Sequence, residues 1–166
     1  MSVRQIRLYG DPVLKTVCDP IKDFNAAISG LVDDLMDTTT LVAGRAGVAA
    51  NQIGISLRAF SYNAENQTGY LLNPENLIVS GEPELVDEGC LSLPGLWHST
   101  LRYPQASLTG YLLDGSQVTV SGTGVLAQAL QHELDHLNGL VYLDRLSPEE
   151  RRAAMAALRE TDWFLR

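Results

Sequence analysis

Two histidines four residues apart, His132 and His136, place the strongest constraint on how this 166-residue chain can fold. They enclose Glu133 in the pattern H-E-x-x-H, inside a predicted helix from about Val125 to Leu137 that ends at Asn138-Gly139. Positions four apart lie one turn apart on the same face of a helix, so both imidazoles can bind one metal ion. The glutamate beside them can take a proton from metal-bound water. The pattern favours a catalytic metal centre over two histidines on a solvated helix.

The rest of the chain predicts one α+β domain, residues 1–166, with antiparallel strands and with helices near both ends. Apolar residues at helical spacing predict an amphipathic helix from about Asn25 to Val42, and Ser147-Pro148 predicts the start of a last helix. Asn73-Pro74 reads as a break, and residues 82–100 read as an ordered loop. Period-two alternation and turn residues predict strands over 57–62, 69–72, 77–79, 107–113 and 117–120. We expect strongly bent antiparallel sheets packed around the central H-E-x-x-H helix.

Composition limits the classes of partner. The net charge of −8 disfavours direct binding of nucleic acid, because phosphate backbones demand basic patches. No stretch approaches about 18 consecutive apolar residues, so we expect no membrane span. The opening MSVRQIRLYG lacks the apolar run of a secretory signal. We therefore expect a cytoplasmic protein whose two cysteines, Cys18 and Cys90, are reduced.

A catalytic ion needs a third protein ligand, and spacing alone leaves this ligand open. One class of zinc protease has a third histidine ligand at the position that Tyr142 occupies here, so this sequence lacks the third ligand of that class. Glu160 would suit a zinc peptidase that takes a glutamate from a later helix. Cys90, in the predicted loop, could approach the ion as a thiolate or act as the nucleophile of a cysteine hydrolase. Cys18 could complete a closed, non-catalytic zinc site, although we interpret it as a small buried hydrophobe.

Three motifs, in this order along the chain, resemble those of the bacterial-type peptide deformylases. Residues 45–52 (RAGVAANQ) correspond to G-x-G-φ-A-A-x-Q, where φ is apolar. Residues 88–92 match E-G-C-φ-S completely, and residues 131–136 match Q-H-E-φ-D-H completely. The first motif departs at Arg45, which replaces its first glycine, and a glycine stands just before it at Gly44. The departure concerns the loop near the substrate rather than the metal ligands.

The resemblance implies the reaction, which is hydrolysis of the formyl group from the N-terminal methionine of newly made polypeptides with release of formate. Glu133 would carry the proton, and the Gln52 side chain and the Leu91 backbone N–H are similar to the family's two oxyanion donors. The resemblance also implies Fe²⁺ as the physiological ion, replaceable by Zn²⁺, Ni²⁺ or Co²⁺. The implied metal ligands are Cys90, His132 and His136.

The substrate site is expected to be narrow at the ion and apolar beside it. The residues expected to contact substrate come from the motifs and from the start of the ligand helix: Gly47, Val48, Val86, Gly89, Val125, Gln128 and Ala129. Glu88 and Arg102 can pair to hold the Cys90 loop, with a surface ion pair or no contact as the alternatives. The partners implied are nascent N-formyl-Met polypeptides, with transient proximity to the ribosome, and we expect a monomer.

Overall fold

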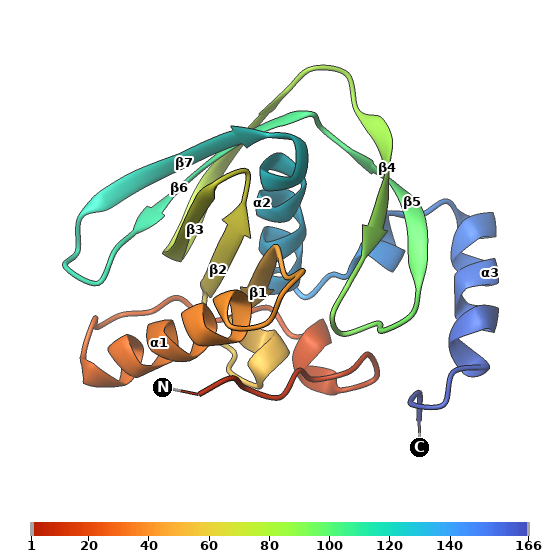
Figure 1. Ribbon diagram of the computed structural model, residues 1–166, viewed down its shortest axis with the longest axis horizontal. Coiled ribbons are helices and arrows are strands. Elements are labelled where there is room, and N and C mark those ends of the chain that lie inside the picture. Colours follow the sequence, from red (N-terminus) through yellow and green to blue (C-terminus); the bar gives the residue numbers. More distant parts are fainter. Residues whose placement is uncertain (1, 166) are drawn as a thin grey trace.

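The computed structural model describes residues 2–165 and confirms the α+β class, with helices and antiparallel sheets (Figure 1). The elements in chain order are η1 (Pro12–Lys15), α1 (Ala26–Thr40), β1 (Gly47–Ala49), η2 (Ala50–Ile53), β2 (Ala59–Ala64), β3 (Gln67–Ser80), β4 (Glu84–Gly89), β5 (Trp97–Arg102), β6 (Gln105–Tyr111), β7 (Gln117–Thr123), α2 (Gly124–Leu137), η3 (Tyr142–Arg145) and α3 (Pro148–Arg159), where η marks a short 3-10 helix. None of the helices within residues 2–165 is both long and apolar enough to cross a membrane.

The strands form two antiparallel sheets on either side of α2 (Figure 1). The larger sheet has the order β1-β2-β3-β6-β7, and the smaller one is the β4–β5 hairpin. Within the described residues β1 pairs with β2 alone, so its outer edge carries no strand. The helix that carries H-E-x-x-H therefore stands between a sheet and a hairpin, each of which can bring residues to it.

The predicted break at Asn73-Pro74 is wrong, because β3 runs continuously through it as a 14-residue strand. The pairing of β3 with β6 shifts register on both sides of Glu75, and a bulged strand bends and tolerates a proline there. Asn73 adopts a left-handed φ of 46°. Its side chain accepts from the Ile21 N–H at 2.8 Å and donates to the Ile21 carbonyl at 2.9 Å, which stabilises the kink. The kink at Asn73-Pro74, which we predicted to end a strand, is therefore a bend within a curved sheet.

The predicted loop over residues 82–100 is also wrong for most of its length. Residues 84–89 and 97–102 pair as the β4–β5 hairpin, with Glu84 opposite Arg102 and Gly89 opposite Trp97. Two of the inward-facing residues of this hairpin, Glu88 and Arg102, are charged and buried. The apolar alternation that signals a strand is therefore missing from the sequence, and only residues 90–96 remain as the connection.

The helix predictions are confirmed because their end signals are local. The Asn25 side chain accepts from the N–H groups of Ala27 and Ile28 at the start of α1, and Ser147 caps α3. Gly139 follows α2 with a φ of +75°, where a side chain would press on the Lys15 backbone at 2.8 Å.

One side of α2 is fixed to the large sheet by a buried apolar cluster. Burying each large side chain of this kind stabilises the fold by roughly 1.5–3 kcal/mol, so α2 is firmly held. The cluster includes Cys18, Phe60, Leu71, Leu108, Leu126, Leu130 and Leu137. Cys18 is 3% exposed within it, which confirms its interpretation as a small buried hydrophobe.

Candidate active site

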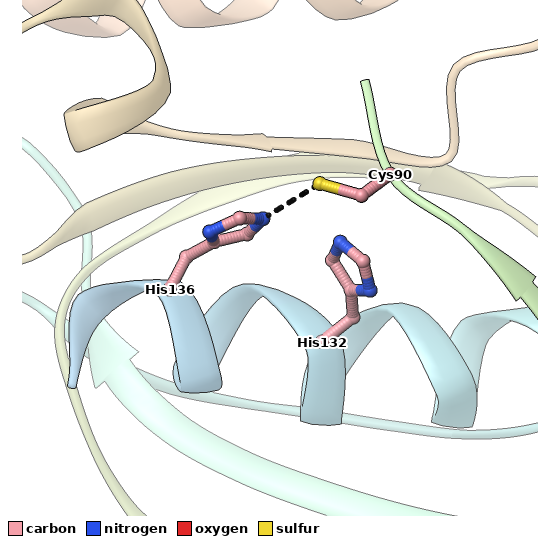
Figure 2. A group of neighbouring side chains, drawn as sticks. All are labelled: Cys90, His132 and His136. Atoms are coloured by element: carbon pink, nitrogen blue, oxygen red, sulfur yellow. Dashed lines mark hydrogen bonds between the residues drawn. The ribbon is translucent and has the colours of Figure 1, made fainter. Parts of the chain in front are cut away.

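The side chains of Cys90, His132 and His136 converge at one point (Figure 2). Cys90 follows the end of β4, and the two imidazoles project from neighbouring turns of α2 toward its sulfur (Figure 2). One ligand atom from each residue lies within 4.8 Å of the other two, and the Cys90 Sγ is 3.2 Å from the His136 Nε2. This set of one sulfur and two imidazole nitrogens fits a tetrahedral divalent ion and leaves a fourth position open.

The other two candidates for the third ligand lie away from this point. Within residues 2–165 the metal-ligating group contains neither Cys18 nor Glu160. Burial raises the pKa of Cys18 to about 11, which disfavours the thiolate that a metal ligand or nucleophile needs. Glu160 is the C-terminal cap of α3.

A buried chain of charges holds His132. The Nδ1 of this ring lies 2.7 Å from the Glu88 Oε1, which leaves Nε2 for an ion. Arg102 donates to both oxygens of Glu88 at 2.6 and 2.8 Å and to the Asp135 carboxylate at 2.8 Å. Burial alone would raise the pKa of Glu88, but the hydrogen bonds from Arg102 and His132 outweigh it and lower that pKa to about 2. The expected pairing of Glu88 with Arg102 is confirmed as a buried contact rather than a surface one.

We predict that Arg102→Met lowers the free energy of unfolding by about 3–5 kcal/mol, because Glu88 and Asp135 would stay buried with too little positive charge beside them. Urea unfolding of the metal-free protein measures this loss. Arg4→Met is the matched control, since the Arg4 side chain is 53% exposed where it meets Asp34. The control should cost little, because exposed ion pairs contribute little to stability. Equal small losses from both variants would contradict the structural role of the buried charges.

Glu133 is 3% exposed and packs against the edge strand β1. A side-chain carbon added at Gly47 would lie 2.6 Å from the Glu133 Oε1, so only glycine leaves room for this carboxyl. Burial raises the pKa of Glu133 to about 7. A carboxyl with a pKa near neutrality can both take and return a proton at physiological pH.

The amide of Gln52 is oriented toward Cys90 by its other contact. The Gln52 Oε1 accepts from the Ala49 backbone N–H at 2.9 Å, so the amide nitrogen must face the other way. That nitrogen lies 3.6 Å from the Cys90 Sγ and 3.2 Å from the Ser92 Oγ. Leu91 follows Cys90 directly and lines the same cavity. One amide donor, the Gln52 side chain, therefore lies next to the metal group.

A cavity of about 480 Å³ opens beside the metal group. Five of the seven expected substrate contacts line it: Gly47, Gly89, Val125, Gln128 and Ala129. Val48 lies elsewhere, because strand alternation turns it away from Gly47 into the core beneath α1. Val86 also lies outside the lining, although the next three residues of β4, which are nearer to Cys90, line it.

Sequence reasoning missed most of the far wall of the cavity. Residues 93–97 line it, and Trp97 lies against Gly89, where an added side-chain carbon would meet the indole at 3.0 Å. Trp97 is 70% exposed, which is unusual for so large an apolar side chain. The available signal in the sequence was its position shortly after the E-G-C-φ-S motif, which ends at Ser92.

Arg45 turns its side chain to α1. The guanidinium donates to the Thr38 carbonyl at 2.7 Å, in the last turn of that helix. Gly44 takes the left-handed conformation just before it, with a φ of +82°. The loop before β1 is thus anchored to α1 where the motif usually has a glycine, while Gly47 keeps its place beside Glu133.

Comparison with known proteins finds similarity over nearly the whole chain. A family model described as polypeptide deformylase matches residues 3–152. A peptide deformylase of Parafrankia sp. is 49% identical over 164 residues, which cover 98% of this chain and 89% of the relative. Peptide deformylase 1 of Corynebacterium glutamicum is 41% identical and covers 99% of each chain. The crystal structure of a peptide deformylase from Legionella pneumophila matches with a TM-score of 0.86 at 32% identity, over 96% of this chain and 95% of that chain.

Proposed function

This chain belongs to the polypeptide deformylase family, and on that basis we propose which of its residues perform each part of the reaction. Deformylases are metal-dependent hydrolases that remove the formyl group from the N-terminal methionine of newly made polypeptides, and this is the activity of the chain. The observation that carries the assignment of residues is the convergence of Cys90, His132 and His136 beside a cavity that Glu133 lines.

We assign the divalent ion to these three side chains and propose Fe²⁺ as the ion used in the cell, with Zn²⁺, Ni²⁺ or Co²⁺ able to replace it. A thiolate with two neutral imidazoles suits each of these ions. Burial lowers the pKa of His136 well below its usual value, so that ring is neutral, as a ligand must be. Burial alone would also lower the pKa of His132, but contacts with Cys90 and Glu88 outweigh it and raise that pKa, so that ring must release a proton when it binds an ion. When bound, the ion supplies Lewis acidity toward water and toward the formyl oxygen.

Glu133 is assigned as the group that moves the proton. Its Oε2 has no hydrogen-bond partner within residues 2–165, and its pKa is about 7. Both support this role, because the carboxylate can accept a proton from the attacking water and then deliver it to the leaving amine. The Gln52 amide and the Leu91 backbone N–H are assigned as donors to the oxyanion that forms at the formyl carbon. Losing one such donor typically raises the barrier by roughly 3–4 kcal/mol.

The substrate is proposed to enter along the edge of β1, with its methionine side chain in the cavity. The outer edge of β1 has no strand beside it among the described residues, so its backbone groups can bind an extended peptide. Gly47 and Gly89 line the cavity, and the space beside each of them is filled by Glu133 and Trp97, so the site is narrow there. Val125, Gln128 and Ala129 form the part of the wall that α2 contributes and would contact the methionine side chain.

We further propose that residues 1–166 act as one catalytic domain, as a monomer in the cytoplasm. Nascent N-formyl-Met polypeptides are the proposed partners, with transient proximity to the ribosome where those chains emerge.

The tight fit at Gly47 predicts that Gly47→Ala reduces kcat on formyl-Met peptides by roughly 100-fold, because the new methyl group must displace the Glu133 carboxyl by an ångström or more. The metal content should not change. Gly30→Ala is the matched control, since nothing lies within 4 Å of a side-chain carbon at that position in α1. Wild-type kcat in Gly47→Ala would mean that Glu133 is not held where we assign it.

The proposed site predicts that formyl-Met peptides are hydrolysed at least about 10-fold faster than the acetyl analogues. The space that a side chain at Gly47 or Gly89 would occupy is already filled by Glu133 and Trp97, so the extra methyl of an acetyl group has little room. A competition between matched formyl- and acetyl-Met-Ala-Ser peptides, with iron-loaded protein protected from oxygen, measures the ratio by release of the free amine. Equal rates would mean that the site is not built for formyl. No release from either peptide would favour a non-catalytic metal module.

A further inference from the structure

Two buried polar atoms behind the metal group have no hydrogen-bond partner among residues 2–165: the His136 Nδ1 and the Asn51 Oδ1. Both residues are 0% exposed, and neither lines the cavity. Leaving a buried donor or acceptor unsatisfied costs about 1–3 kcal/mol. The third such atom, the Glu133 Oε2, belongs to a residue that lines the cavity, where the substrate binds. The first two atoms therefore need another explanation.

The chemistry of these two atoms is complementary. The His136 Nε2 faces the Cys90 Sγ at 3.2 Å, so an ion bound at Nε2 leaves the proton of the ring on Nδ1 as a donor. The Asn51 amide nitrogen donates to the His136 backbone carbonyl at 2.6 Å, which assigns the oxygen of that amide as a free acceptor. One donor and one acceptor thus remain, and the amide that supplies the acceptor already contacts His136.

We propose that Asn51 positions His136 through one buried water molecule, which accepts from the Nδ1–H and donates to the Asn51 Oδ1. A buried water needs two to four polar partners, and these two atoms supply the minimum. A metal-binding histidine almost always donates its second N–H to such a partner, which fixes the orientation of the ring. The proposal rests on the assignment of His136 as a ligand under the proposed function.

With this contact, each of the three metal ligands is oriented by a different residue. Glu88, from β4, holds His132 directly through a carboxylate. Gln52 and Asn51, consecutive in η2, reach Cys90 and His136. Asn51 occupies the variable position of the first motif, between the alanines and the glutamine, so the motif pattern does not require an amide there. His136 would thus be held by a neutral group and His132 by a charged one.

The test compares Asn51→Leu with the wild-type protein, both loaded with Zn²⁺. In ¹⁵N–¹H spectra the Nδ1–H of His136 should be protected from exchange in the wild type and should shift and exchange faster in the variant. The Nδ1–H of His132, bonded to Glu88, is the internal control and should not change. Zinc transfer to a chromophoric chelator should show affinity weakened by about 10- to 100-fold in the variant.

Gln131→Leu is the matched control, because Gln131 is also a buried amide at α2 but bonds Tyr103 and Ala127 rather than a ligand. It should leave both the His136 resonance and the zinc affinity as in the wild type. An unchanged His136 resonance and unchanged affinity in Asn51→Leu would overturn the proposal, as would equal losses in Gln131→Leu. Formate release by the wild-type protein tests the assigned reaction separately, since the resonance and the affinity do not depend on turnover.

Discussion

Replacing Glu133 by glutamine is expected to leave the ion bound and to reduce formate release by about 100- to 10,000-fold, the usual contribution of a general acid–base group. Glutamine keeps the shape of the side chain, so the packing against Gly47 survives. It cannot accept a proton, so no proton would be removed from the attacking water and none would be delivered to the leaving amine. The expected pattern is a lower kcat with little change in KM.

Metal analysis and formate release on the same preparation measure this prediction. Glu149→Gln is a suitable control, because Glu149 is an exposed residue in the first turn of α3 and lies outside the cavity. It should retain full activity. Near-normal turnover by metal-loaded Glu133→Gln would assign the proton transfer to another group, and loss of the ion would give Glu133 a structural role instead.

The parts of the fold that could be predicted are those specified by neighbouring residues. Helix α1 follows from apolar spacing and a capping asparagine, and α2 and α3 follow from their end signals. The β4–β5 hairpin could not be predicted in this way, because the inward residues Glu88 and Arg102 are charged. Burying them is tolerable only because they bond each other and because Arg102 also reaches Asp135, 33 residues further along the chain. Such a pairing has no local signal.

The site also has one part with a local sequence signal and one part without. The spacing of the two histidines fixes their common face on α2, so that half of the metal group follows from helix geometry. The third ligand depends on where β4 ends relative to α2, and three residues remained open on spacing alone. The fold selects among them by bringing Cys90, 42 residues before His132, within 3.2 Å of His136. Of the expected substrate contacts, Val48 lies outside the cavity lining because one step along a strand reverses the face. Val86 lies outside it although the next three residues of β4 line the cavity.

The choice of Cys90 predicts that Cys90→Ala loses the ion and, with it, formate release. Losing a residue that supports a ligand weakens metal binding by about 10- to 100-fold, so removing the ligand itself should cost more than about 100-fold. Cys18→Ser and Glu160→Gln are the matched controls, and each removes one of the other two candidates. Both should keep their metal and their activity, although Cys18→Ser places a hydroxyl in the apolar cluster and should be less stable.

Metal content per chain after gel filtration, together with formate release, separates the alternatives. A zinc peptidase would lose its ion in Glu160→Gln, a closed zinc module would lose it in Cys18→Ser, and a cysteine hydrolase would lose turnover in Cys90→Ala without any dependence on metal. Only loss of the ion and of turnover together, confined to Cys90→Ala, agrees with a sulfur ligand at the end of β4.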